Sequence, residues 1–176
     1  MLLTYHNLVI RNATQEDAVQ LATWWNDGAI MAHAGFPYGL GTTAEAVANQ
    51  LKRDTDDTYR RLIIECDESP IGEMSYCNMG NRVAEIGIKI CDDSKQERGY
   101  GRLLLSLLID SLFHEYGYEK IILDTNQKNT RAQHVYNSLG FQQTGIEVDS
   151  WQNQDGELQT SIFYELNEEN FINFAK

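Results

Sequence analysis

Basic residues are scarce in this chain of 176 residues, which has 14 lysines and arginines against 26 aspartates and glutamates. The formal net charge of −12 repels polyanions, so we expect neither a nucleic acid nor an anionic membrane as a partner. The same charge attracts cations, including amines. The shortage of positive charge therefore argues against polyanionic partners and favours cationic ones.

Cysteines, histidines and long apolar runs are also scarce. Cys66, Cys77 and Cys91 are odd in number and widely spaced, which argues against a disulfide framework and is typical of a reducing, cytoplasmic location. The four histidines have no metal-ligand spacing, so we expect no metal. The longest apolar run, 103–109, is too short to span a bilayer, and the first six residues do not resemble a secretory signal.

What is present is a succession of strand and helix patterns without a repeat or a linker. The length and the apolar content of 42% fit a single domain over residues 1–176. The periodicity predicts the order β-α-α-β-β-β-α-β-α-β-β, an α+β fold with one mixed sheet and helices on both faces. The predicted strands are 8–11, 59–65, 71–78, 83–90, 120–124, 141–149 and 158–166, and the predicted helices start after Thr14, at Thr43, at Tyr100 and after Asn129.

The helix predicted over 100–116 is apolar on most faces. Ser106, Asp110 and His114 recur at intervals of four residues and predict the stripe that faces water. Together with the strands on either side, this helix predicts a right-handed parallel crossover.

The loop Gln96–Arg102 is the most informative stretch, because Gly99 and Gly101 precede an apolar helix directly. Its backbone N–H groups and the helix N-terminus are placed to bind an anion, above all a phosphate. It is neither a P-loop nor a dinucleotide fingerprint, because no Gly-Lys-Ser/Thr and no third glycine follow. On this pattern alone, a tight turn is the more frequent explanation.

The element order and two motifs together resemble the GCN5-related N-acetyltransferase (GNAT) superfamily over residues 8–166. The family loop pattern Gln/Arg-x-x-Gly-x-Gly/Ala is matched by Gln96, Gly99 and Gly101. A second pattern, Asn-x-x-Ala-x-x-x-Tyr-x-x-x-Gly-Phe, is matched by Asn129, Ala132, Tyr136, Gly140 and Phe141. Residues 84–87, Ala-Glu-Ile-Gly, are similar to the ribosomal-protein-acetylating branch. The resemblance implies a GNAT-like acyl-CoA N-acyltransferase fold.

The resemblance also implies acetyl-CoA as the cosubstrate, with no metal. By this likeness the loop holds the pyrophosphate, and the end of the strand 83–90 runs beside the pantetheine arm, where the family separates two strands. A backbone N–H near Ile88 is then expected to stabilise the oxyanion. An N-cap explains Asn129 equally well. The cofactor-binding residues implied are Ile88, Lys89, Ile90, Gln96, Glu97, Arg98, Gly99, Tyr100, Gly101, Arg102, Asn129 and Tyr136.

Acetyl transfer to an amine requires a base, because an alkyl ammonium has a pKa of about 10.4. Strand alternation places Glu85 and Lys89 on one face, so Glu85 is the first candidate base, and an ion pair with Arg82 or Lys89 is its equal alternative. Asp124 is the second candidate, although turn capping is the more frequent role. The resemblance implies Tyr136 as the acid that protonates the leaving thiolate. From spacing alone Tyr136 is a core aromatic.

Aromatic and acidic residues in the first helices and the last hairpin suit a cationic acceptor. Trp25, Phe36, Tyr38 and Glu85 are the predicted acceptor-binding residues, with core packing or a turn as the alternative roles of the aromatics. The resemblance implies an N-acetyltransferase that acts directly on a primary amine, either a small cation or a protein N-terminus, rather than through Cys91. The alternatives are a catalytically idle acyl-CoA sensor on the same fold and a different nucleotide-binding enzyme. A homodimer is compatible with the sequence.

Overall fold

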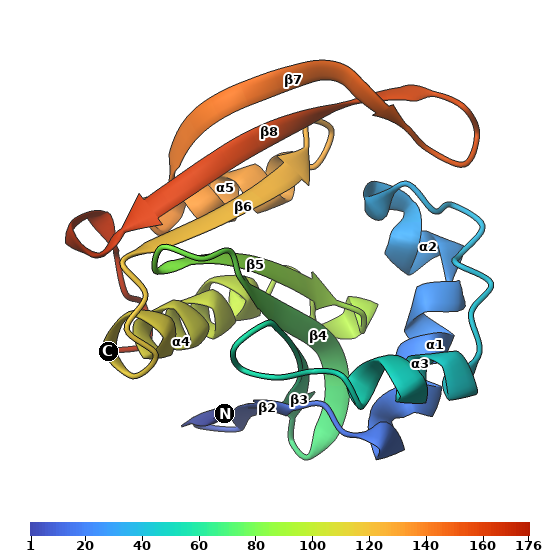
Figure 1. Cartoon of the computed structure of the whole chain (residues 1–176), viewed down its shortest axis with the longest axis horizontal. Helices are drawn as coiled ribbons and strands as arrows, with labels where there is room; N and C mark the ends of the chain where they lie inside the picture. Colours follow the sequence, from blue (N-terminus) through green and yellow to red (C-terminus); the bar gives the residue numbers. More distant parts are fainter.

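The computed structural model describes residues 1–176, and its core is one mixed sheet of eight strands (Figure 1). The strands lie side by side in the order β1-β2-β3-β4-β5-β6-β8-β7. They are β1 (Leu2–Tyr5), β2 (Leu8–Asn12), β3 (Tyr59–Cys66), β4 (Ser69–Asn78), β5 (Val83–Ile90), β6 (Lys120–Asn126), β7 (Gln142–Gln152) and β8 (Leu158–Asn167). The helices are α1 (Ala18–Asn26), α2 (Gly28–Met31), α3 (Ala44–Leu51), α4 (Tyr100–His114) and α5 (Thr130–Ser138).

The predicted α+β fold is confirmed, and the structure adds two short elements to it. β1 pairs antiparallel with β2 at the edge of the sheet. α2 is a single turn, and the Asp27 carboxylate caps it by accepting a hydrogen bond from the Ala29 N–H at 2.8 Å. Such short elements depend on pairing and capping rather than on hydrophobic period, so the sequence pattern did not show them.

Two hydrophobic cores lie on opposite faces of the sheet. α4 and α5 cover the face that includes Leu62, Met74 and Ala84, in a cluster of 25 buried residues. α1 and α3 cover the other face, where Ile63 joins a smaller cluster of 11 (Figure 1). Leu62 and Ile63 are both 0% exposed, so β3 is buried on both of its faces. None of the helices has the length and apolar character that a membrane crossing requires.

β5 and β6 run parallel, as predicted, but they stay together only at their start. Val83, Ala84 and Glu85 pair with residues 120–122, and no further pair joins the two strands. β5 continues along β4 as far as Ile90, while β6 continues along β8 as far as Asn126. The sheet is therefore split in its middle, and the edges that face the split have no strand partner there.

The predicted water-facing stripe on α4 is wrong at Ser106 and holds at its other end, where the side chain of His114 is 52% exposed. Ser106 is 0% exposed, and its hydroxyl accepts a hydrogen bond from the Phe174 N–H at 3.0 Å. Asp110 accepts another from Asn173 Nδ2 at 2.9 Å. Phe171 and Phe174 pack against the main core. The stripe therefore holds the segment 168–175 against the helix, and only its far end, at Asp110 and His114, is also open to solvent.

Candidate active site

A cavity of about 440 Å³, here called the loop cavity, lies at the start of α4. The end of β5, the loop before α4, the first turn of α4 and one face of α5 form its walls. Every residue predicted to bind the cofactor lines it except Lys89 and Arg98. The structure thus brings two motifs from different parts of the chain around one hollow.

Gly99 gives the loop its shape. It is the N-cap of α4 with φ +79°, a left-handed conformation that glycine adopts without steric cost. Apart from its neighbours along the chain, no atom lies within 4 Å of the position that a Cβ would take, and no side chain caps the helix. The 15-residue helix therefore begins beside the loop cavity with no side-chain cap on its first N–H groups. This arrangement fits a phosphate-bearing ligand.

Gln96 fastens the loop to the strand and to α5. Its Nε2 donates to the Ile90 carbonyl at 3.0 Å, and its Oε1 accepts from Arg131 Nη1 at 2.8 Å. Asn129 caps α5, because its Oδ1 accepts from the Ala132 N–H at 3.2 Å. The N-cap role considered for Asn129 is confirmed, and the residue also lines the loop cavity.

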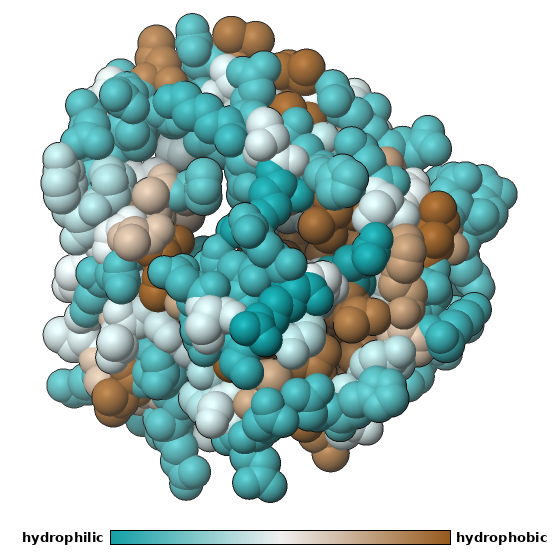
Figure 2. Space-filling model, turned by 180° about the vertical axis from the view of Figure 1, so that it is seen from behind, coloured by the Kyte–Doolittle hydropathy of each residue, from teal (hydrophilic) through white to brown (hydrophobic).

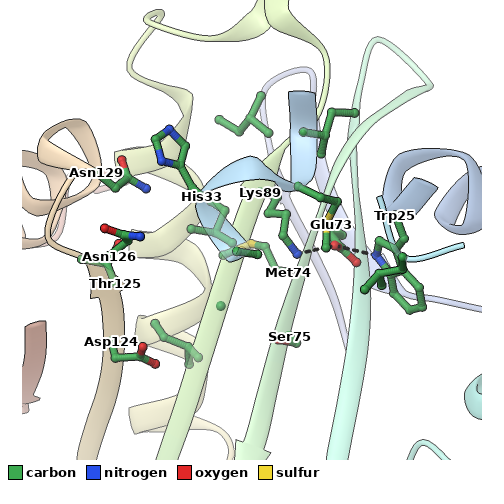
Figure 3. Close-up of a pocket in the computed structure, with 18 of the residues that line it drawn as sticks. Trp25, His33, Glu73, Met74, Ser75, Lys89, Asp124, Thr125, Asn126 and Asn129 are labelled. Carbon is green, nitrogen blue, oxygen red and sulfur yellow. Dashed lines mark hydrogen bonds and ion pairs between the residues drawn. The ribbon is translucent and has the colours of Figure 1, made fainter. Parts of the chain in front are cut away.

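A second cavity, of about 870 Å³, lies on the α1–α2 side of the split (Figure 3). It is here called the sheet cavity, because β4, β5 and β6 form much of its wall. Seen from behind, the surface is hollowed between the hairpin and the first helices, and mostly hydrophilic residues surround the hollow (Figure 2). The residues common to both cavities are Ile88, Ile90, Gln96, Asn129, Arg131 and Tyr136. The two cavities therefore adjoin at the split between β5 and β6.

A polar cluster around Glu73 forms one wall of the sheet cavity. Glu73 is 8% exposed and accepts hydrogen bonds from Trp25 Nε1 at 2.8 Å and Lys89 Nζ at 3.0 Å (Figure 3). Glu73 and Lys89 are direct cross-strand partners on β4 and β5. Glu73 was not among the predicted site residues, although it is the lone carboxylate in the strand pattern 71–78 and was an available signal. Because Lys89 neutralises it, Glu73 is not a free base.

Two carboxylates without an ion pair lie near the point where β5 and β6 part. Partial burial raises the pKa of Asp124 and, with the charge of Asp124 nearby, that of Glu85. Asp124 lines the sheet cavity across from Glu73, and Glu85 is not among the lining residues (Figure 3). The ion pair considered for Glu85 is absent, because Arg82 and Lys89 pair with other carboxylates.

Tyr136 lies on α5 and lines both cavities. Its ring is 7% exposed and packs 5.8 Å from the rings of Phe141 and Tyr164, so its predicted core role is confirmed. No hydrogen bond engages its hydroxyl, and no polar side-chain atom is both sealed and unpaired, so the hydroxyl remains open to the cavities. Burial, with a contribution from Asp124, raises the pKa of Tyr136 to about 12. A tyrosine that stays protonated at this junction can donate a proton.

The three aromatic residues predicted to bind the acceptor lie in different places in the structure, and only one of them lines the sheet cavity. Trp25 lines the sheet cavity beside Glu73. Phe36 packs against the smaller core, and Tyr38 is 73% exposed, with its hydroxyl donating to Asp155 at 2.6 Å. Neither Phe36 nor Tyr38 lines the sheet cavity.

The tip of the β7–β8 hairpin contacts the loop that follows α2 (Figure 1). The Gln154 N–H donates to the Gly35 carbonyl at 2.9 Å, and Gln154 Nε2 donates to the Gly39 carbonyl at 2.8 Å. Trp151, which lines the cavity, covers Gly35 so closely that a Cβ there would lie 2.4 Å from the ring. These contacts bound the sheet cavity on the side of the hairpin.

The remaining candidate chemistries have little support in the structure. The chain has no group of three or more histidines, cysteines or carboxylates that could hold a metal ion. Cys66, Cys77 and Cys91 are all free thiols. Cys91 lines neither cavity, and burial raises its pKa to about 12, which disfavours the thiolate that a nucleophile needs.

Comparison with known proteins assigns the chain to a protein family. Residues 7–142 match the acetyltransferase (GNAT) domain. Spermidine N(1)-acetyltransferase of Escherichia coli (strain K12) is 27% identical over 142 residues, which are 80% of this chain and 75% of that protein. A ribosomal protein bS18-alanine N-acetyltransferase of Haemophilus ducreyi is 33% identical over 75 residues, which are 43% of this chain and about half (51%) of that protein.

Solved structures of low sequence identity share the fold. Spermidine N-acetyltransferase from Vibrio cholerae, in complex with CoA and spermine, superposes with a TM-score of 0.81 at 24% identity, over 95% of this chain and 99% of that one. Ribosomal L7/L12 alpha-N-protein acetyltransferase, in complex with coenzyme A, gives 0.83 at 16% identity, over 95% and 98% of the two chains. Because the family model spans most of the sequence, the chain belongs to the acetyltransferase (GNAT) domain family and is an N-acetyltransferase.

Proposed function

We propose that the chain transfers acetyl from acetyl-CoA directly to the primary amine of a small aliphatic cation. One observation carries the proposal, namely the meeting of the two cavities at the split between β5 and β6. An uncapped helix N-terminus lies beside the loop cavity, the unpaired carboxylate of Asp124 lines the sheet cavity, and Tyr136 lines both cavities. A phosphate-bearing donor and a cationic acceptor can thus approach each other from opposite sides.

The loop cavity is the proposed donor site. The backbone N–H groups of Gln96–Arg102 and the first turn of α4 would bind the diphosphate. The edge of Ile88–Ile90 has no β6 partner and would bind the amides of the pantetheine arm. Acetyl-CoA, when bound, supplies a thioester whose carbonyl carbon an amine can attack.

The carboxylates at the split are the proposed proton acceptors. Asp124 is the member that lines the cavity, and its charge acts on Glu85. A raised pKa brings a carboxylate closer to neutral pH, which improves its match to a proton transfer. Tyr136, which lines both cavities, would hold the proton that the leaving sulfur takes up. These roles favour an active enzyme over an idle sensor.

The sheet cavity supports a small cationic acceptor. Its unpaired carboxylate, Asp124, attracts an ammonium group, and the indole rings of Trp25 and Trp151 line the same space. The contact between the hairpin tip and the loop after α2 closes one side of the sheet cavity, which restricts the access of a folded protein substrate. One curated relative is a spermidine acetyltransferase and covers most of this chain. We therefore propose an aliphatic diamine or polyamine. The free thiols support a reducing, cytoplasmic location, and a homodimer stays a prediction.

An amine panel tests this proposal. Acetyl transfer from acetyl-CoA is followed by mass spectrometry with putrescine, spermidine, an aminoglycoside and peptides that have a free N-terminus. We expect kcat/KM for the polyamines to exceed that for the peptides by about tenfold or more, because a peptide lacks a second ammonium for the cavity. A preference for peptides would overturn the acceptor class. Coenzyme A binding without turnover would favour the sensor, and thermal stabilisation by ATP or NAD but not by coenzyme A would overturn the donor site.

A further inference from the structure

Arg102 stands at a position that elementary helix electrostatics disfavour. It lies in the first turn of α4, where the macrodipole repels a cation, and that turn contains no acidic residue. Its side chain lines the loop cavity. A residue that breaks a local rule at the edge of a cavity is a candidate for a functional role.

The guanidinium of Arg102 is held by a ring from far along the chain. Its Cζ lies 4.2 Å from the centroid of the Phe174 ring, which is a cation–π contact. A guanidinium that stacks on a ring keeps its N–H groups free along the edge. Those N–H groups form bidentate hydrogen bonds with phosphate oxygens. The stack therefore orients the group for a phosphate and leaves its donors available.

Phe174 is itself fixed by the stripe along α4. Its backbone N–H donates to the Ser106 hydroxyl, which is buried one helical turn after Arg102. The next turns hold the same segment, because Asp110 accepts from Asn173 at 2.9 Å and His114 Nε2 lies 3.1 Å from a Glu168 oxygen. Positions 102, 106, 110 and 114 thus form one continuous row that begins at the loop cavity.

We propose that Phe174 is a positioning residue for the donor site, which it serves by aiming Arg102 at a phosphate of coenzyme A. The segment 168–175 then belongs to the cofactor site, although it lies outside the two motifs. The orientation of a single cationic side chain is important here, because the protein as a whole has a net charge of −12 and repels a polyphosphate. This inference rests on the proposed donor site.

The test compares Phe174→Leu, which keeps an apolar side chain, with Phe174→Trp, which keeps the aromatic face. Phe171→Leu is the matched control, because Phe171 belongs to the same segment and packs on Phe113 at 6.0 Å instead of on Arg102. The dissociation constant of coenzyme A is measured by calorimetry. We expect Phe174→Leu to raise it about threefold, and Phe174→Trp and Phe171→Leu to leave it near the wild-type value.

Two further measurements separate positioning from loss of structure. Arg102→Met should raise the dissociation constant about tenfold, and adding Phe174→Leu to it should change nothing more, since the ring acts only through Arg102. KM for acetyl-CoA should rise with the dissociation constant while kcat holds, and KM for the N-acetylcysteamine thioester, which lacks phosphates, should not move. If Phe174→Leu does not fold, Phe174→Met takes its place with the same expectations.

Multiplicative effects of the two substitutions, or an unchanged dissociation constant in Phe174→Leu, would overturn the inference. A wild-type chain that does not bind coenzyme A would instead overturn the proposed donor site. A wild type that binds and acetylates while Phe174→Leu behaves identically would remove only the role of Phe174.

Discussion

The two cavities meet at one split in the sheet, but they are built in different ways. The loop cavity draws its walls from residues between Ile88 and Ser138, and backbone conformation at Gly99 and the start of α4 shapes it. The sheet cavity draws on residues between Trp25 and Ser161, and its cluster at Glu73 joins side chains from α1, β4 and β5. The proposed donor site thus draws on one continuous part of the chain, from β5 to α5, whereas the proposed acceptor site depends on contacts across the whole fold.

Tyr136 belongs to both cavities, so its loss should give the largest effect. Tyr136→Phe removes the hydroxyl and keeps the ring against Phe141 and Tyr164. We expect kcat to fall by roughly 10²-fold or more while the dissociation constant of coenzyme A stays within about twofold, since a proton donor acts on the chemical step. Steady-state kinetics and calorimetry measure the two quantities.

Tyr164→Phe is the matched control for this substitution. Tyr164 lies 5.8 Å from Tyr136, is 3% exposed and lines neither cavity. Its variant should retain wild-type kcat. If Tyr136→Phe turns over as fast as Tyr164→Phe, the assignment of Tyr136 as the acid is wrong.

Gly99 tests whether the loop cavity depends on its backbone. Gly99→Val should raise KM for acetyl-CoA about 10–100-fold, because a side chain on the outward face of the loop blocks charge-assisted hydrogen bonds from the N–H groups to a phosphate. Gly80→Val is a close control, since Gly80 has φ +80° against +79° at Gly99 and open space around it as well. Both variants should lose similar stability from left-handed strain, and only Gly99→Val should lose affinity. Equal KM values in the two variants would contradict the donor site.

The same contrast explains what the sequence could reveal. The residues around the loop cavity were predicted through the resemblance of two motifs to the GNAT superfamily, whereas local rules alone gave a turn at Gly99 and an N-cap at Asn129. Strand alternation likewise placed Glu85 and Lys89 on one face of β5 before the structure showed their neighbours. Local rules of this kind hold regardless of the rest of the fold.

The sheet cavity could not be predicted in the same way. Glu73 accepts a hydrogen bond from Trp25 only because α1 packs on the sheet. The Tyr38 hydroxyl lies at the surface, where it donates to Asp155 at the hairpin tip. The predicted stripe on α4 was wrong at Ser106 for the same reason, since the buried Ser106 hydroxyl accepts a hydrogen bond from the Phe174 N–H. Each outcome depends on a contact between residues far apart in the sequence, which neither period nor composition contains.

The two carboxylates at the split, Asp124 and Glu85, predict that kcat/KM depends on pH. The pKa of Asp124 and that of Glu85 are both raised, so the base becomes protonated as the pH falls through those raised values. The acidic limb of kcat/KM should therefore lie above the ordinary range of a carboxylate. Asp124→Asn should lower kcat/KM about 10–10²-fold and remove this limb, and Glu85→Gln should cost less because Glu85 does not line the cavity. A pH profile that is the same in Asp124→Asn and wild type would exclude Asp124 as the base.

The smallest expected effect is a change in Tm, which should have opposite signs for substitutions of Asp124 and Glu73, on opposite walls of the sheet cavity. Because the folded pKa of Asp124 is raised, the folded state binds more protons than the unfolded state between the ordinary and the raised value, and stability falls as the pH rises through that window. At neutral pH the charged Asp124 therefore opposes folding, and Asp124→Asn should raise Tm slightly, on the order of 1 °C. Glu73→Gln should instead lower Tm, because Glu73 is buried and paired, and its loss leaves Lys89 without a counter-charge. Scanning calorimetry at neutral and acidic pH measures both signs. A fall in Tm for Asp124→Asn at neutral pH would show that the Asp124 carboxylate stabilises the folded state instead of destabilising it.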